Sequence, residues 1–149
     1  MLSAHLIRVI ETHAEELTRE LLDDLGRNPR TPSFHSMSRD QLRTRVYDVY
    51  HNLGKWLAEQ DETHIEAVYG EMGRRIHAAA TPASELIYVV ILIKEHLRSY
   101  IRRTGSAATS VELHLEAELN LLIGHFFDKA LYHSLRGYEG AARTPTLAS

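Results

Sequence analysis

Apolar residues recur every three or four positions along almost the whole chain. Between residues 42 and 57, for instance, Leu42, Val46 and Val49 are followed by further apolar residues at the same spacing. Positions with this spacing share one face of an α-helix, whereas a half-buried strand alternates apolar and polar residues. The pattern predicts an all-α fold, a bundle of about five helices.

Residues that favour helix starts divide this pattern into separate helices. Ser38 and Asp61 can cap free backbone N–H groups with a side-chain oxygen. Thr81 followed by Pro82 predicts another helix start, because backbone N–H groups in the first turn have no partner within the helix and proline lacks this group. The expected helices cover about residues 2–25, 38–59, 61–77, 82–103 and 110–138.

Glycines are expected to end the first and the last of these helices. Gly26 follows the first helix and opens a proline-containing loop over residues 26–37. Gly137 and Gly140 would end the last helix. We therefore expect a single domain over residues 1–140 and a flexible tail over residues 141–149.

The fourth expected helix is apolar on every side, since residues 86–93 contain no charged side chain. Such a helix is usually buried all round, so it is either the central helix of the domain or part of an oligomer interface. The last helix carries two adjacent apolar stripes, which can meet two neighbours at once. As a homodimer interface the pattern offers Ile91, Leu115, Leu119, Leu122 and Phe126.

Composition excludes several classes of function. The chain has 149 residues, of which 44% are apolar and 25% charged, as in one globular domain. Its net charge of −3 gives no basic surface for nucleic acid, and the absence of cysteine excludes disulfides and thiolate chemistry. No signal-peptide pattern and no membrane-spanning apolar run is present. We expect a cytoplasmic protein that binds no nucleic acid and does not insert into a membrane.

Ten histidines raise the question of a metal or haem site. Ligands on one helix need a spacing of three or four residues to share a face, and no two histidines have it. The sequence also lacks a Gly-x-Ser-x-Gly elbow and a glycine-rich phosphate loop. We expect no cofactor and no enzymatic activity. The alternative is a haem- or metal-binding helical protein that uses His77, His96 or His125.

Several aromatic residues lie on or beside the apolar stripes, where they either fill the core or line a pocket. A pocket, if the domain has one, is expected between the second, third and fourth helices. Its expected lining residues are Trp56, Tyr69, Met72, His77 and Tyr88.

Four segments together resemble one known family. They are residues 53–57 (Leu-Gly-Lys-Trp-Leu), residues 73–97 from Gly-Arg-Arg-Ile-His to Lys-Glu-His-Leu, residues 126–132 (Phe-Phe-Asp-Lys-Ala-Leu-Tyr) and residues 136–138 (Arg-Gly-Tyr). The chain is similar over about residues 5–139 to the N-terminal sensory domain of the RsbT co-antagonist family.

This resemblance implies a globin-like fold that generally lacks haem and forms dimers through its late helices. Domains of this family act as sensing or docking modules ahead of a STAS domain in stressosomes, or ahead of histidine-kinase output modules. A rough alignment on Pro82 places Arg75, rather than His77, where haem-containing sensor globins have their proximal histidine. The sequence shows no STAS-like or kinase segment, so we expect either a stand-alone domain or a fragment of a longer protein, with binding as its role.

Taken with the apolar faces of the late helices, this resemblance implies a non-enzymatic sensor or protein-interaction domain of bacterial signal transduction, acting as a homodimer. A signalling protein is its expected partner, and a small-molecule ligand is compatible with this role.

Overall fold

The computed structural model describes residues 2–104 and 110–143, except for the side chains of residues 2–7, 9–11, 104, 110–113, 115 and 116. This part of the chain is helical and contains no strand, so the all-α prediction is confirmed. Its elements are α1 (Leu2–Arg27), the short 3₁₀ helix η1 (Pro32–Phe34), α2 (Arg39–Glu59), α3 (Glu62–Ala78), α4 (Ala83–Thr104) and α5 (Ser110–Arg143).

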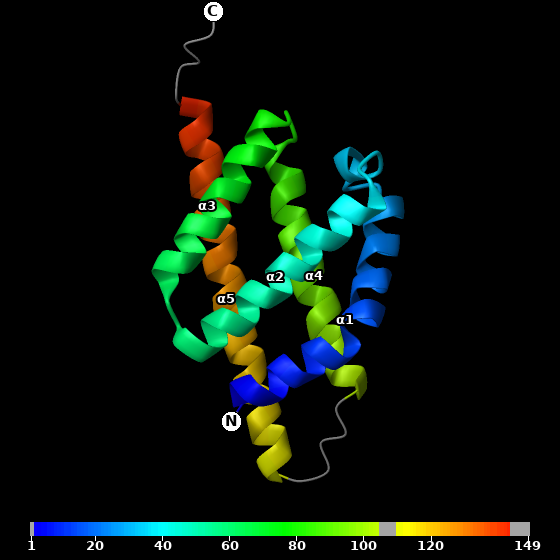
Figure 1. The fold of residues 1–149 in the computed structure, drawn as a ribbon, viewed down its shortest axis with the longest axis vertical. Helices are drawn as coiled ribbons and strands as arrows, with labels where there is room; N and C mark the ends of the chain where they lie inside the picture. The colour runs from blue at the N-terminus through cyan, green and yellow to red at the C-terminus, as the bar shows by residue number, and fades with distance from the viewer. Residues whose placement is uncertain (1, 105–109, 144–149) are drawn as a thin grey trace, which may run out of the picture.

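The five α-helices of the described chain form a bundle in which α5, the longest, runs along the long axis (Figure 1). α3 packs closely along the C-terminal half of α5, α4 also packs on α5, and α1 packs on both α2 and α4. The apolar fourth helix is mostly buried within the single chain, with Leu86 and Leu97 in the core. Only Ile87, Tyr88 and Ile91 of its apolar run stay partly exposed.

The expected starts of α2 and α3 are confirmed by their capping contacts. The Ser38 side chain accepts a hydrogen bond from the Gln41 backbone N–H at 3.4 Å, and Asp61 accepts one from the Thr63 N–H at 3.0 Å. α4 begins at Ala83, directly after Pro82. Each cap satisfies a backbone donor that has no partner within the helix itself.

The expected helix ends at glycine residues are wrong. α1 continues through Gly26 to Arg27, and α5 continues through Gly137 and Gly140 to Arg143. None of the described glycines has the positive φ that a glycine C-cap uses. α5 therefore extends past residue 140, and residues 144–149 of the expected tail lie outside the described part of the chain.

The real use of Gly137 is a close crossing between α3 and α5. A Cβ atom at Gly137 would overlap the backbone carbonyl of Gly70, and one at Gly73 would overlap the carbonyl of Ser134. Only glycine allows two helix backbones to approach this closely. The crossing therefore fixes α3 on α5 by direct backbone contact.

An aromatic cluster fills the core next to this crossing. The Phe126 ring lies 5.1 Å from Phe127, 5.9 Å from Tyr69 and 6.1 Å from Trp56, measured between ring centroids. Edge-on and tilted contacts at these distances are favourable arrangements of aromatic rings. Residues from α2, α3 and α5 thus meet around one buried phenylalanine.

Candidate functional site

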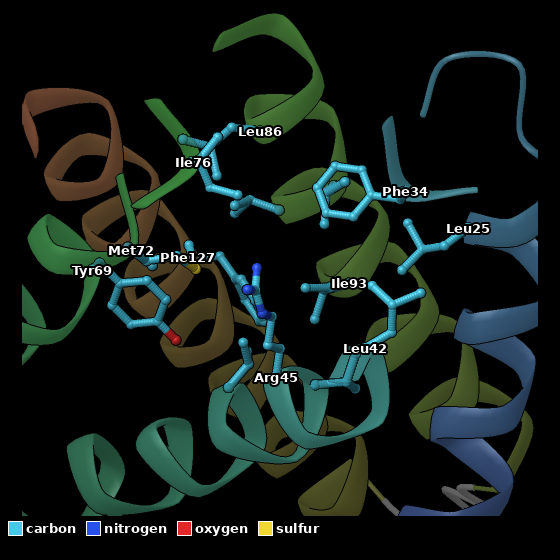
Figure 2. Close-up of a pocket in the computed structure, with 15 residues that line it drawn as sticks. Leu25, Phe34, Leu42, Arg45, Tyr69, Met72, Ile76, Leu86, Ile93 and Phe127 are labelled. Atoms are coloured by element: carbon cyan, nitrogen blue, oxygen red, sulfur yellow. The ribbon is translucent and has the colours of Figure 1, made fainter. Parts of the chain in front are cut away.

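An apolar pocket lies where α2, α3, α4 and α5 meet, with α1 and η1 closing one side (Figure 2). Its space, with the open mouth included, is about 590 Å³, and the centre of a water-sized sphere can occupy about 50 Å³ of it. The lining residues are Leu25, Phe34, Leu42, Arg45, Val46, Val49, Tyr69, Met72, Ile76, Leu86, Val89, Val90, Ile93, Phe127 and Ala130.

The helical spacing of the sequence explains how each helix contributes to this lining. α3, for example, contributes Tyr69, Met72 and Ile76 at intervals of three and four residues, which is one face of the helix. The next residues along α3, Gly70 and Gly73, face α5 at the close crossing. The same helix therefore offers large side chains to the pocket and none to the crossing.

A buried glutamate holds η1 as one wall of the pocket. Glu85 is 6% exposed, and its two carboxylate oxygens accept hydrogen bonds from the Ser33 backbone N–H at 2.8 Å and from the Ser33 hydroxyl at 2.6 Å. Glu85 lies in the first turn of α4, where the helix dipole favours a negative charge. This contact places the neighbouring Phe34 ring against the pocket.

Arg45 is the one charged residue in the lining, and its side chain is exposed at the mouth. In Figure 2 it runs from α2 toward the middle of the ring of apolar side chains. Its neighbours Arg39 and Arg43 form ion pairs with Asp23 and Glu15 on α1. Arg45 has no hydrogen bond or ion pair with any described residue. The Arg45 guanidinium at the mouth is therefore available to a ligand.

The Tyr69 hydroxyl is a second polar group at the pocket. It is buried, and no described group meets it at hydrogen-bonding distance and angle. Figure 2 shows it directed toward α2, the helix that carries Arg45. Burial raises the pKa of this hydroxyl, and the nearby Asp48 charge adds to the rise. The Asn52 side chain, acting as a hydrogen-bond donor, lowers the pKa by a smaller amount. Tyr69 therefore stays a neutral donor with an unused proton.

Two of the five residues expected to line a pocket do so. Tyr69 and Met72 are in the lining, which also lies between α2, α3 and α4 as expected. Trp56 packs in the aromatic core against Phe126 instead. His77 stacks edge-on against Tyr138, and Tyr88 lies under the Arg30 guanidinium at 5.4 Å.

The residues offered for a dimer interface separate into two groups. Phe126 is 0% exposed and Leu119 is buried, so within one chain they belong to the core rather than to a surface. Ile91 and Leu122 are partly exposed. The Leu115 side chain lies outside the described part of the structure.

The three histidines of the haem or metal alternative point to different places. His77 contacts Tyr138, His96 pairs with Asp24 at 2.8 Å, and His125 is exposed on α5. None of the three lines the apolar pocket. Within the described residues, no group of three or more His, Asp or Glu side chains is placed to hold a metal ion.

Sequence reasoning missed Arg45, although its position carried a signal. Arg45 lies three residues after Leu42 and four before Val49, so it shares the apolar face of α2. A basic residue on such a face is unusual and marks a place where charge meets an apolar space. The sequence offered no comparable indication for Phe34. Its position at the pocket depends on the contact between Ser33 and Glu85, which are far apart in the sequence.

No protein-family model, curated protein or solved structure matches the chain. The resemblance to the RsbT co-antagonist family therefore stays a prediction from the sequence. Among the described helices, none combines the length and the apolar character needed to cross a membrane.

Proposed function

We propose that the chain is a globin-like, non-haem sensor and protein-interaction domain of bacterial signal transduction, of the stressosome or histidine-kinase type. It acts without catalysis, as a homodimer in the cytoplasm. The observation that supports this proposal is the apolar pocket at the junction of α2, α3, α4 and α5. A ligand at such a junction contacts several helices at once and can alter how they pack.

The signal would be a shift in helix packing around a fixed pair. Because α3 and α5 touch through their backbones at Gly73 and Gly137, they move as one unit. Filling the pocket pushes on α2 and α4 relative to this unit. A ligand changes the equilibrium between two states of the domain only if it binds one state more tightly than the other. A different position of the pocket wall in the two states would give this difference in affinity.

Exposed apolar side chains on α5 support a homodimer. Leu121 is 60% exposed and Tyr132 is 58% exposed, and they lie about three helical turns apart on the same side of the helix. The partly exposed Leu122 on α5 and Ile91 on α4 add to the apolar surface of these late helices. Leu121 and Tyr132 are the large apolar side chains that are exposed among the described residues, which makes this side of α5 the surface to test for a contact.

Sedimentation equilibrium tests the dimer. The wild-type chain should be dimeric at micromolar concentration, and Leu121→Glu should dissociate it by placing a charge in the interface. Ala67→Glu, an exposed position on α3, adds the same charge elsewhere and should leave the dimer intact. A monomeric wild-type chain would contradict the proposed assembly.

The same measurement tests the link between pocket and assembly. Saturating the pocket with 1-decanol, a neutral apolar probe, should change the dimer dissociation constant, because α4 and α5 serve both sites. A dissociation constant that stays the same while 1-decanol is bound would contradict the sensor mechanism.

A further inference from the structure

We propose that the ligand of this pocket is an amphipathic carboxylic acid, such as a medium-chain fatty acid. Its alkyl tail lies among the apolar side chains and its carboxylate binds the Arg45 guanidinium. This inference rests on the proposed role of the pocket as a ligand site. It adds the chemical class of the ligand and the residue that recognises it.

The lining selects an alkyl group for the interior. Leu86, Val90, Ile93 and Phe127 offer no hydrogen-bond partner, so a polar group placed among them would lose its water without compensation. An alkyl chain has no hydrogen bonds to lose there, and its transfer from water to the apolar interior is favourable. The interior therefore accepts only the apolar part of a ligand.

The mouth selects one negative charge. A guanidinium presents parallel N–H donors that match the two oxygens of a carboxylate. Arg45 is free for this contact, whereas the flanking Arg39 and Arg43 are already paired with α1 carboxylates. Asp48, the next acidic residue along α2, forms no ion pair with Arg45. A single cation suits a monovalent carboxylate better than a doubly charged phosphate, for which the lining offers no second cation.

Tyr69 gives the site a second donor. Its buried hydroxyl makes no hydrogen bond of good geometry with a described group, and Figure 2 shows it directed toward α2, the helix that carries Arg45. The nearby Asn52 amide lowers its pKa as a hydrogen-bond donor, which leaves the proton of the tyrosine hydroxyl available. A buried unpaired donor is costly, and a ligand oxygen that accepts from it removes this cost. Tyr69 thereby favours a ligand with an acceptor close to the apolar interior.

The small free volume requires side chains to move on binding. About 50 Å³ is roughly a third of an engineered cavity that takes up benzene, so a long alkyl tail does not fit the pocket as it stands. Met72 is flexible and partly exposed, and Arg45 is exposed and unpaired, so both can move aside. Entry of the tail is therefore coupled to a rearrangement at the mouth, which is what a sensor needs.

Isothermal titration of the full chain with decanoate and with 1-decanol at neutral pH tests the assignment. Wild type should bind decanoate about tenfold or more tightly than 1-decanol, the usual effect of a charge-assisted hydrogen bond. Arg45→Gln should remove this preference, chiefly by weakening decanoate binding, and a wild-type circular dichroism spectrum and urea midpoint show that the variant is folded. Lys55→Gln removes one exposed charge from the same helix outside the lining, and should keep the preference.

Two further variants refine the roles of the donors. Arg45→Lys keeps the charge without the paired donors, so it should retain only part of the preference for decanoate. Tyr69→Phe should weaken decanoate binding more than 1-decanol binding, since a carboxylate accepts a stronger hydrogen bond from the Tyr69 hydroxyl than an alcohol oxygen does.

The outcomes separate this inference from the proposed function. Equal binding of decanoate and 1-decanol, in wild type and in Arg45→Gln alike, would overturn the acid assignment and leave an apolar-ligand sensor standing. Tighter binding of decyl phosphate than of decanoate would overturn the carboxylate assignment. Binding of neither decanoate nor 1-decanol by the folded wild-type chain would overturn both this inference and the proposed function.

Discussion

α3 is packed in opposite ways on two adjoining faces. On one face Gly70 and Gly73 let its backbone touch α5, with no room for even one methyl group at Gly73. On the other face Tyr69 and Met72 border a pocket that is not filled. The difference shows that side-chain size along a single helix separates a rigid contact from an adaptable one. A domain that senses a ligand needs both kinds of contact, because the helices around the pocket can change position only relative to a part of the domain that stays fixed.

The largest expected effect is at the rigid contact. Gly73→Ala should lower the free energy of unfolding by about 3 kcal/mol or more, since its methyl group overlaps the Ser134 carbonyl and backbone atoms cannot move aside cheaply. Urea unfolding followed by circular dichroism measures this loss.

Gly124→Ala is the matched control on α5, because an added Cβ there meets no atom within 4 Å. Alanine is the better helix former, so this variant should be more stable than wild type by roughly 0.5–1 kcal/mol. Similar unfolding curves for Gly73→Ala and Gly124→Ala would show that the crossing is not close-packed.

The next largest effect is at the wall of the pocket. Glu85→Ala leaves the Ser33 N–H and hydroxyl without their acceptors, and should cost about 2 kcal/mol of unfolding free energy. Glu85→Gln keeps one acceptor oxygen and should lose less. If Glu85→Ala is as stable as wild type in urea, the wall does not depend on this contact.

A smaller, pH-dependent contribution to the free energy of unfolding is expected from Asp24 and His96, which meet where α1 packs on α4. Although desolvation raises the pKa of Asp24, hydrogen bonds from His96 and Asn28 outweigh it and hold this pKa below its ordinary value. A carboxylate with a lowered folded-state pKa stabilises the protein above its unfolded-state pKa, about 3.9, and this contribution disappears as the pH falls through the folded-state pKa.

The unfolding free energy of wild type relative to Asp24→Asn, measured from neutral pH into the acid range, reports this contribution. The pair is partly exposed, with 22% of the His96 and 32% of the Asp24 side chain accessible, so the difference should be about 1 kcal/mol or less. It should shrink toward zero below pH 4. A difference that grows in acid would contradict the assignment.

The smallest effect is expected inside the pocket itself. Val90→Ile adds one methylene to a lining that has unfilled space, so it should change stability by less than about 1 kcal/mol, in the stabilising direction. It should also weaken 1-decanol binding, because it occupies part of the same space. A clear loss of thermal stability would mean that the pocket is already filled, and the contrast with the α3–α5 crossing would then fail.

Most of the helices could be predicted from the sequence, because their starts depend on local chemistry. Ser38 and Asp61 cap their own helices, and apolar spacing identifies the buried faces. The ends at Gly137 and Gly140 were predicted wrongly for a physical reason. Glycine suits both a helix end and a close helix contact, and the sequence does not say which partner, if any, lies opposite.

The site could be predicted only in part. Its location between α2, α3 and α4 and two of its residues, Tyr69 and Met72, follow from helical spacing. Trp56 and Phe126 carry the same apolar signal, yet they meet each other in the core, because spacing does not distinguish a filled interior from a hollow one. Arg45 was overlooked because the sequence does not show which arginines of α2 form ion pairs. In the structure, carboxylates on α1 pair with Arg39 and Arg43 and leave Arg45 without an ion pair.

The most direct test of the acid-binding pocket is the methyl NMR spectrum of the chain with saturating decanoate. The account predicts contacts between the decanoate chain and the methyl groups of Ile76, Leu86 and Ile93, all of which line the pocket. At a decanoate concentration that only just saturates wild type, these contacts should be clearly weaker in Arg45→Gln, in line with its loss of affinity. Contacts confined to the methyl groups of the exposed Leu121, or no contacts at all, would contradict it.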